Sequence, residues 1–325
     1  MSTSSLRSVA TLLILLFFHI EGVFARGRGK GVGDTAGDAS DTGSDLGLSG
    51  VFQAVFALTI VIAVLTLYQL GTSLKRFKSL QLPDGEPTLP YDVGILFRIL
   101  LTFYTVMFIL NQALYATFIA SFGRRFFLPE GFQIGMVFTG QFSTVLFYAT
   151  PLSIIAYRQR IQLNPSQNLF NLKTFLDGLL LAIILILGVA QDGLAATATF
   201  RKDFIALSDL GVAYNVFAFL ASLNVAISSF MARIRLSRAG VQDKIINISA
   251  FAVSPTVLAG GIFNIIDLGI RRNAGPFFNS DGLFIAYIVI GGIVSIATIA
   301  WCLRMGAPPK PIKSDDKGVA VEKKV

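Results

Sequence analysis

The side chains best suited to chemistry in this chain are polar groups that recur at helical spacing within otherwise apolar segments. Tyr104, Asn111 and Tyr115 are seven and four residues apart, so a helix places them on one stripe. Gln141, Thr144 and Tyr148, three and four residues apart, form a similar stripe in the next apolar segment. Hydroxyl, amide and carboxylate groups arranged in this way bind a ligand through hydrogen bonds and charge. The other positions of this kind are Asp192, Asp209, Asn264 and Asp267.

Two interpretations of these polar stripes follow from their surroundings. An unpaired amide or carboxylate facing hydrocarbon costs several kcal/mol, so each stripe should face the interior of a helix bundle or a wet cavity. The stripes then either hold helices together through hydrogen bonds or line a pocket that opens outward. In the second case, we expect Asn111, Gln141 and Asp267 to share one ligand cavity with the other polar positions named above.

Residue types argue against catalysis. The only histidine, His19, falls in a predicted signal peptide, so a histidine-ligated zinc hydrolase and a serine–histidine enzyme are not expected. The only cysteine, Cys302, allows neither an intrachain disulfide nor a thiolate metal cluster, and simple burial is its expected role. The sequences around Asp192 and Asp267 lack the glycine-framed pattern of an intramembrane aspartyl protease. We therefore expect neither an enzyme nor a bound cofactor or metal.

The composition indicates that lipid is the main partner of the chain. Hydrophobic residues make up 54% of the sequence and charged residues only 14%, which is more apolar than a soluble globular domain. The formal net charge is +8, but the basic residues form short clusters between apolar runs and no single basic face. Binding to the lipid bilayer is therefore expected, and binding to nucleic acid is not.

Seven apolar runs are each long enough to cross about 30 Å of hydrocarbon as a helix. An all-α polytopic membrane protein with a seven-transmembrane-helix bundle over residues 51–304 is predicted, because a spanning segment must satisfy its backbone hydrogen bonds internally. The expected helices are 51–71, 93–122, 132–157, 174–199, 206–232, 246–270 and 282–304.

The ends of the chain complete the predicted organisation. Residues 1–25 combine an early arginine, an apolar core and small residues before Ala25, which is typical of a signal peptide cut after Ala25. An uncleaved anchor helix is the alternative. Residues 26–50 are rich in Gly, Asp and Ser and are expected to be a disordered extracellular or lumenal tail. Residues 305–325 are expected to form a basic cytoplasmic tail.

The distribution of lysine and arginine predicts the orientation. One side of the predicted bundle carries sixteen basic residues and the other nine, and the richer side should be cytoplasmic. The N-terminus is then outside and the C-terminus inside, in agreement with a cleaved signal peptide. We expect an integral membrane protein of the secretory pathway, and the plasma membrane is favoured over the endoplasmic reticulum because the final "EKKV" only approximates a dilysine retrieval signal.

Proline and glycine residues mark places where helices could bend or meet. Pro151 and Pro255 fall within predicted helices, where each removes a backbone hydrogen bond and favours a kink. The glycine pairs 260–261 and 291–292 are expected to let the sixth and seventh helices approach closely.

The number and orientation of the helices resemble those of G-protein-coupled receptors over residues 51–304. The residues themselves do not follow the rhodopsin-like class: "IAYRQR" stands at Ile155–Arg160 where an acidic-Arg-Tyr motif would close the third helix. The seventh helix also lacks an Asn-Pro-x-x-Tyr pattern. The likeness is one of topology and is shared with seven-helix lipid exporters, so it assigns no family.

Three functions remain open from the sequence. The first is a receptor-like sensor of a small extracellular ligand that signals to a cytosolic partner through the third inner loop and the lysine-rich tail. The second is a transporter or exporter of a lipid or amphipathic solute, and the third is a non-catalytic membrane scaffold. For a sensor, the expected contacts to the cytosolic partner are Arg233, Arg235 and Arg238.

Overall fold

The computed structural model describes residues 50–79, 93–123, 130–163, 172–197, 201–273 and 280–306. The predicted signal peptide, nearly all of the tail that follows it and the predicted tail beyond residue 306 lie outside these described residues. The described helices are α2 (Gly50–Ser79), α3 (Ile95–Gly123), α4 (Glu130–Leu163), α5 (Leu172–Thr197), α6 (Arg201–Arg238), α7 (Lys244–Ile248), α8 (Ser254–Asn273) and α9 (Ser280–Met305). A π-helical turn, η2 (Ser249–Val253), joins α7 to α8, so these three segments form one rod.

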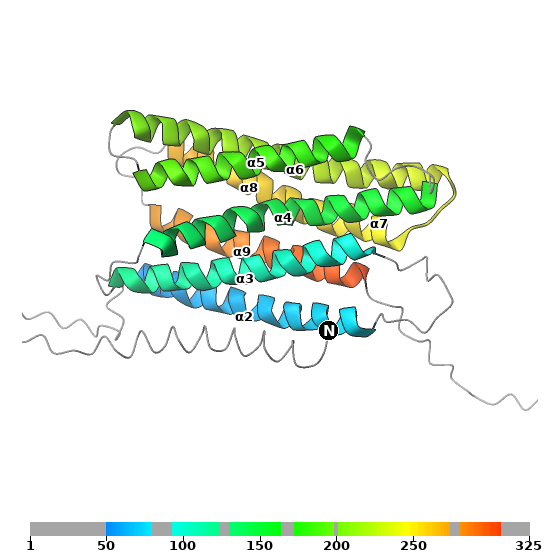
Figure 1. Cartoon of the computed structure of the whole chain (residues 1–325), viewed down its shortest axis with the longest axis horizontal. Coiled ribbons are helices and arrows are strands. Elements are labelled where there is room, and N and C mark those ends of the chain that lie inside the picture. The colour runs from blue at the N-terminus through cyan, green and yellow to red at the C-terminus, as the bar shows by residue number, and fades with distance from the viewer. Residues whose placement is uncertain are drawn as a thin grey trace, which may run out of the picture.

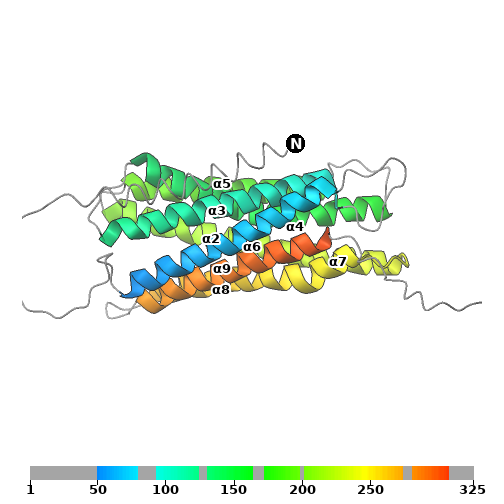
Figure 2. The ribbon, with the colours of Figure 1, turned by 90° about the horizontal axis from the view of Figure 1, so that it is seen from below.

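The rods pack side by side as a closed bundle in which neighbours along the chain run in opposite directions (Figure 1). Each rod contacts the next, and α2 closes the ring by packing against α9, which lies beside α8 in Figure 2. The helix α4 also contacts α6, α7 and the π-helical turn, so it has partners in the bundle beyond its two neighbours along the chain. We call the end where α4, α6 and α9 finish the basic end, and the other the opposite end.

Six of the described helices or rods are long and apolar enough to cross a membrane: α2, α3, α5, α6, the α7–α8 rod and α9. Large apolar side chains stay exposed along their outer faces, including Val61, Ile99, Ile186, Ile227 and Ile293. Water would penalise such a surface, whereas lipid tails do not. The protein is therefore a multi-pass helical membrane protein whose outer faces contact the bilayer.

The helix α4 falls outside those six because its sequence is more polar. It carries Gln141, Ser143 and Thr144 near its middle and Pro151 beyond them. A helix surrounded by other helices can carry such residues, since its polar groups find partners in the bundle and not in lipid. The low apolarity of α4 thus agrees with its additional partners in the bundle.

Several helices are longer than the apolar runs that predict them. The helix expected over 132–157 spans Glu130–Leu163, and that expected over 206–232 spans Arg201–Arg238. The apolar runs end at charged residues, but backbone hydrogen bonding continues through residues such as Arg235 and Arg238 in the last turn. Hydropathy therefore locates the hydrocarbon-spanning part of a helix and misses its extension toward water.

The glycine pairs form different contacts from those expected. A Cβ at Gly260 would lie 3.0 Å from Val294, which agrees with close packing of α8 on α9. Gly261 instead faces Ser222 of α6, and Gly292 faces Ile62 of α2. Adjacent residues on a helix point about 100° apart, so two neighbouring glycines serve two different neighbours. The prediction that both pairs join α8 to α9 therefore holds only for Gly260: it was wrong for Gly261 and Gly292, and nothing lies within 4 Å of a Cβ at Gly291.

Candidate functional site

A polar contact inside the bundle joins α4 to α5. The Gln141 side-chain nitrogen donates a hydrogen bond to the Asp192 carboxylate at 2.7 Å. Gln141 also lies against Gly188 of α5, where any Cβ would collide with the Gln141 carboxamide. The absence of a side chain at residue 188 thus makes room for the amide that reaches Asp192.

Three buried or half-buried tyrosines lie near this contact, and a fourth, Tyr287, lies at its edge with 45% of its surface exposed. Tyr148 of α4 lies near Tyr104 of α3, Tyr214 of α6 and Tyr287 of α9. Tyr214 also faces Thr144 and Asp192. The side chains come from five helices, and we call them the polar cluster: Tyr104, Gln141, Thr144, Tyr148, Asp192, Tyr214 and Tyr287.

The polar cluster retains hydrogen-bonding capacity. Among the described residues, the Gln141 Oε1 atom is buried without a hydrogen-bond partner. The Tyr104 hydroxyl faces Ser295 of α9 but makes no hydrogen bond of ordinary geometry. A buried polar atom without a partner is costly, so water or a polar group of a ligand would be stabilised at these two atoms. The cluster therefore has two polar atoms whose hydrogen-bonding capacity is unused within the protein.

The other predicted cavity residues lie outside the contacts that define the cluster. Asn111 is held at the α3–α4 interface, where its side-chain nitrogen donates to the Met136 carbonyl at 3.0 Å. Tyr115 stacks on Phe118, with ring centroids 6.4 Å apart. On the remaining helices, the structure places Asp209 exposed on α6, Asn264 half-buried on α8 and Asp267 buried one turn later on the same helix. Their role in a ligand cavity stays a prediction.

Sequence reasoning missed two members of the cluster, Tyr214 and Tyr287. Each stands alone in an apolar run, so its sequence context does not distinguish it from a tyrosine that anchors a helix at the membrane surface. Only the rotation of α6 about its axis turns Tyr214 toward Thr144 of α4, and Tyr287 of α9 stays partly exposed beside the cluster. A weak signal exists at residue 214, because Asn215 and Gly211 make that part of α6 less apolar than its flanks.

The contact between Gln141 and Asp192 predicts a measurable coupling between α4 and α5. Hydrogen bonds between membrane helices contribute about 0.6 kcal/mol on average and at most about 1.7 kcal/mol. We expect a coupling energy in that range from a double-mutant cycle of Gln141→Met and Asp192→Leu, each of which removes the hydrogen bond, measured by SDS unfolding in micelles. Strictly additive effects of the two substitutions would contradict the contact.

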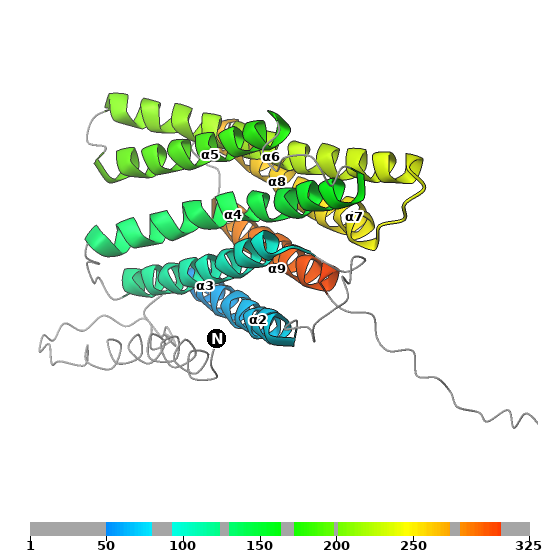
Figure 3. The same cartoon turned by 45° about the vertical axis from the view of Figure 1, so that its right-hand side comes forward.

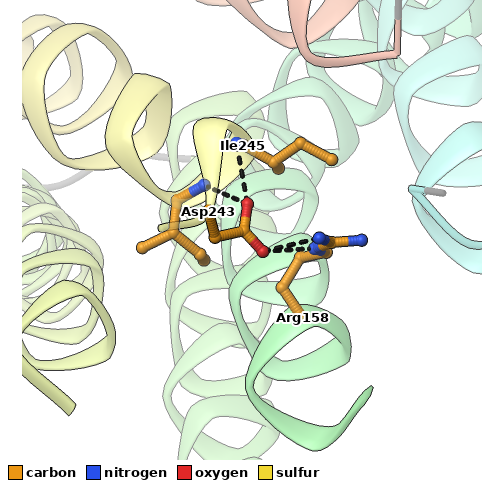
Figure 4. A network of polar contacts seen from close by, with 4 residues as sticks. Arg158, Asp243 and Ile245 are labelled. Carbon is orange, nitrogen blue, oxygen red and sulfur yellow. Dashed lines mark hydrogen bonds and ion pairs between the residues drawn. The ribbon is translucent and has the colours of Figure 1, made fainter. Parts of the chain in front are cut away.

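A second site lies at the basic end, where a buried ion pair joins α4 to α7 (Figure 4). The Asp243 Oδ2 atom accepts from Arg158 Nε at 2.7 Å and lies 2.6 Å from Arg158 Nη2. Both side chains are only 1% exposed. The Asp243 Oδ1 atom accepts from the backbone nitrogens of Ile245 and Ile246 at 2.8 and 3.2 Å, so the same carboxylate caps the first turn of α7.

The ion pair changes the interpretation of Arg158. The sequence places this residue just after a helix, among the basic groups that face the cytoplasm. The structure instead continues α4 through Leu163 and buries the guanidinium against Asp243. No local signal in the sequence predicts the pairing, because the two residues are 85 positions apart. The only hint is an aspartate directly before a helix, the usual N-cap arrangement.

Contacts around the ion pair connect α6 to the same region. The hydroxyls of Ser229 and Ser249 lie 2.9 Å apart and link α6 to the π-helical turn. Arg233 donates to Asn247 at 3.2 Å, and its guanidinium lies 4.3 Å from the centre of the Phe251 ring. Of the three arginines predicted to contact a cytosolic partner, Arg233 is therefore engaged within the protein, whereas Arg235 and Arg238 are exposed at the end of α6.

Asp177 of α5 is paired with side chains of α5 and α6. Its carboxylate accepts from Lys173 at 2.6 Å and from Asn224 of α6 at 2.8 Å. Cys302 is 1% exposed, in agreement with its expected burial. Among the described residues, no group of three or more His, Cys, Asp or Glu side chains is arranged to hold a metal ion.

Comparison with protein-family models, with curated proteins and with solved structures finds no match to this chain. The polar cluster and the buried ion pair are thus the two sites on which a functional argument can stand.

Proposed function

We propose that the protein is a receptor-like seven-helix sensor that binds a small extracellular ligand and signals to a cytosolic partner. In this proposal, the N-terminus is outside and the basic end faces the cytoplasm. The orientation is supported by the many basic side chains at that end, because lysine and arginine are retained on the cytoplasmic side of membranes. Members of this group on the described helices include Lys75, Arg160, Lys173, Arg235, Arg238 and Arg304.

In this proposal α4 is the seventh span. It has 34 residues, which correspond to about 51 Å at a rise of about 1.5 Å per residue. That length exceeds the hydrocarbon thickness of about 30 Å, and the helices around α4 keep its polar groups away from lipid.

The observation that carries the proposal is the buried ion pair between Arg158 and Asp243. Arg158 stands on α4, which also carries three members of the polar cluster, Gln141, Thr144 and Tyr148. Arg158 follows Gln141 by seventeen residues and Tyr148 by ten, or about 26 Å and 15 Å along α4. A buried ion pair is often no more stabilising than apolar residues of the same volume. A contact of this kind is better explained as one that holds two helices together in one state and releases them in another.

The bundle provides a place for such a change. Pro255, which has no backbone N–H to donate, stands two residues after the end of the π-helical turn Ser249–Val253. Helix bends and shifts occur at such interruptions of regular hydrogen bonding. A ligand at the polar cluster would shift α4 against α6, release Asp243 from Arg158 and let α7 move relative to α8. The exposed end of α6, with Arg235 and Arg238, would then present a changed surface to a cytosolic partner.

Cysteine reactivity in sealed proteoliposomes tests the proposal. In a Cys302→Ser background, single cysteines replace Gln141 in the cluster or Ser229 beside the ion pair. Each is compared with the same chain carrying Arg158→Met together with Asp243→Asn, which removes the ion pair without leaving a lone buried charge. An impermeant maleimide is added to one side at a time.

If the protein is a sensor, the helix bundle should open at one end only. Cysteine at residue 229 should react from the cytoplasmic side at least about tenfold faster in the chain without the ion pair, a shift of about 1.4 kcal/mol in opening. Cysteine at residue 141 should react only from the outside in both chains. Reaction of residue 141 from the cytoplasmic side would favour a carrier with alternating access. Unchanged rates at residue 229 would leave a static scaffold as the better description.

A further inference from the structure

A cleft with a volume of about 470 Å³ opens at the basic end between the α7–η2 segment and the last turns of α9. Figures 1 and 3 show these segments next to each other at that end of the bundle. The lining side chains include Lys244 and Asn247 from α7, Phe251 from the π-helical turn, and Trp301 and Arg304 from α9. Neither the polar cluster nor the ion pair includes any of these residues, so the cleft is a separate site.

The two cations of the cleft lie at one boundary of the membrane. Lys244 is the first residue of the apolar span Lys244–Ile270, and Arg304 is the last but one of the span Ile285–Met305. Both side chains are exposed. A cation at the end of an apolar span reaches the headgroup layer, whereas the residues one or two turns further in reach the acyl chains.

The side chains of the cleft suit a ligand that is both negatively charged and partly apolar. Two cations lie beside apolar surface from Ile248, Phe251 and Trp301, and none of the lining residues is acidic. The Arg304 guanidinium lies 5.6 Å from the centre of the Trp301 ring. Arg233, which is not part of the lining, lies 4.3 Å from the centre of the Phe251 ring.

We propose that this cleft binds the phosphate-bearing headgroup of an anionic phospholipid from the adjacent leaflet. Basic pockets at the cytoplasmic ends of membrane helices favour such headgroups, with a contribution from each cation near the surface. Phe251, more than half exposed, offers a surface that an acyl chain covers and a free phosphate ion does not. This inference requires only that the helices span a membrane, so it is independent of the proposed sensor function.

Charge also argues against the chain's own C-terminal segment as the occupant. Residues 307–325 follow α9 directly and contain five lysines against three acidic residues. Their net charge has the same sign as the cleft. Electrostatic repulsion therefore disfavours the segment in the cleft and favours a ligand of opposite sign.

Trp301 makes the proposal directly testable, because it is the only tryptophan of the chain. The full-length protein is placed in nanodiscs that contain phosphatidylcholine and a small fraction of lipid with brominated acyl chains, which quench tryptophan on contact. Quenching by brominated phosphatidylserine is compared with quenching by brominated phosphatidylcholine at the same fraction. We expect the anionic lipid to occupy the cleft with a preference on the order of tenfold.

Matched variants assign the preference to the cleft. Lys244→Gln with Arg304→Gln should reduce the preference to about onefold, because the surface attraction of both cations is lost. Arg235→Gln with Arg238→Gln removes the same charge from the same end of the bundle but outside the cleft, and should keep the preference. Comparing the two lipids within each variant cancels any change that a substitution makes to the fluorescence of Trp301 itself.

Three results would overturn the proposal. The first is equal quenching by the two lipids in the native chain. The second is a preference that survives Lys244→Gln with Arg304→Gln and disappears when residues 307–325 are removed, which would assign lipid attraction to the tail. The third is full reversal of quenching by millimolar inorganic phosphate or glycerol phosphate, which would make the site one for soluble phosphates. Persistence of the preference at those concentrations supports a lipid.

Discussion

Replacing Arg158 with methionine will lower the free energy of unfolding of the bundle by about 3–5 kcal/mol. The substitution keeps most of the volume of the side chain but leaves the Asp243 carboxylate as an uncompensated charge with 1% exposure. One oxygen of that carboxylate still caps α7, so the side chain cannot turn toward water without losing the hydrogen bonds to Ile245 and Ile246. SDS titration in micelles, followed by circular dichroism, measures the change.

Two further variants separate the charge from the other roles of the pair. Arg160→Met removes a cation from the last turn of the same helix and should change the stability by less than about 0.5 kcal/mol, because a partly exposed charge contributes little. Arg158→Met combined with Asp243→Asn leaves no buried charge and keeps a good N-cap residue, so it should be more stable than Arg158→Met alone. If the double variant is no more stable than the single one, the buried charge is not the cause of the loss.

The membrane-spanning architecture follows from the sequence because hydropathy and helix length act residue by residue. An apolar run of sufficient length must form a helix in lipid, whatever its neighbours are. Six of the expected helices therefore reappear as apolar spans. The helix over Glu130–Leu163 was also expected, but its membrane crossing depends on the surrounding helices that shield its polar groups. The sequence alone therefore supports that crossing less strongly than the other six.

The polar contacts are only partly predictable because they depend on how each helix is rotated. The stripe rule places Gln141 and Tyr148 inside the bundle, where the structure has them, but it does not select Asp192 as the partner of Gln141. The rule also predicts that Asn111 lines a cavity as Gln141 does. In the structure, the Asn111 side chain instead donates a hydrogen bond to the α4 backbone at the α3–α4 interface. Which side chains pair depends on how they pack against the neighbouring helix, as Gln141 does against Gly188. A single sequence does not show this packing.

The joint between α6 and α8 is the second place where a small change should have a large effect. Gly261→Ala will destabilise the bundle by about 1–3 kcal/mol, because an added methyl group overpacks a filled interface. The new Cβ would collide with the Ser222 hydroxyl and lie 2.9 Å from the Ser222 Cβ, an atom fixed to the backbone of α6. The hydroxyl cannot easily move aside either, since it donates to the Phe219 carbonyl at 2.8 Å. SDS unfolding in micelles measures this change as well.

The controls for Gly261→Ala lie on the same two helices. Gly269→Ala adds a methyl group to α8 where nothing lies within 4 Å, so it should be neutral or stabilise by up to about 1 kcal/mol through helix propensity. Ser222→Gly combined with Gly261→Ala removes the atoms that the new methyl group meets, and should recover most of the loss. If Ser222→Gly fails to recover it, the destabilisation does not come from the α6–α8 contact. Recovery would show that α8 is held against α6 at Gly261. The place where the α7–α8 rod can bend is then the π-helical turn Ser249–Val253, which precedes α8.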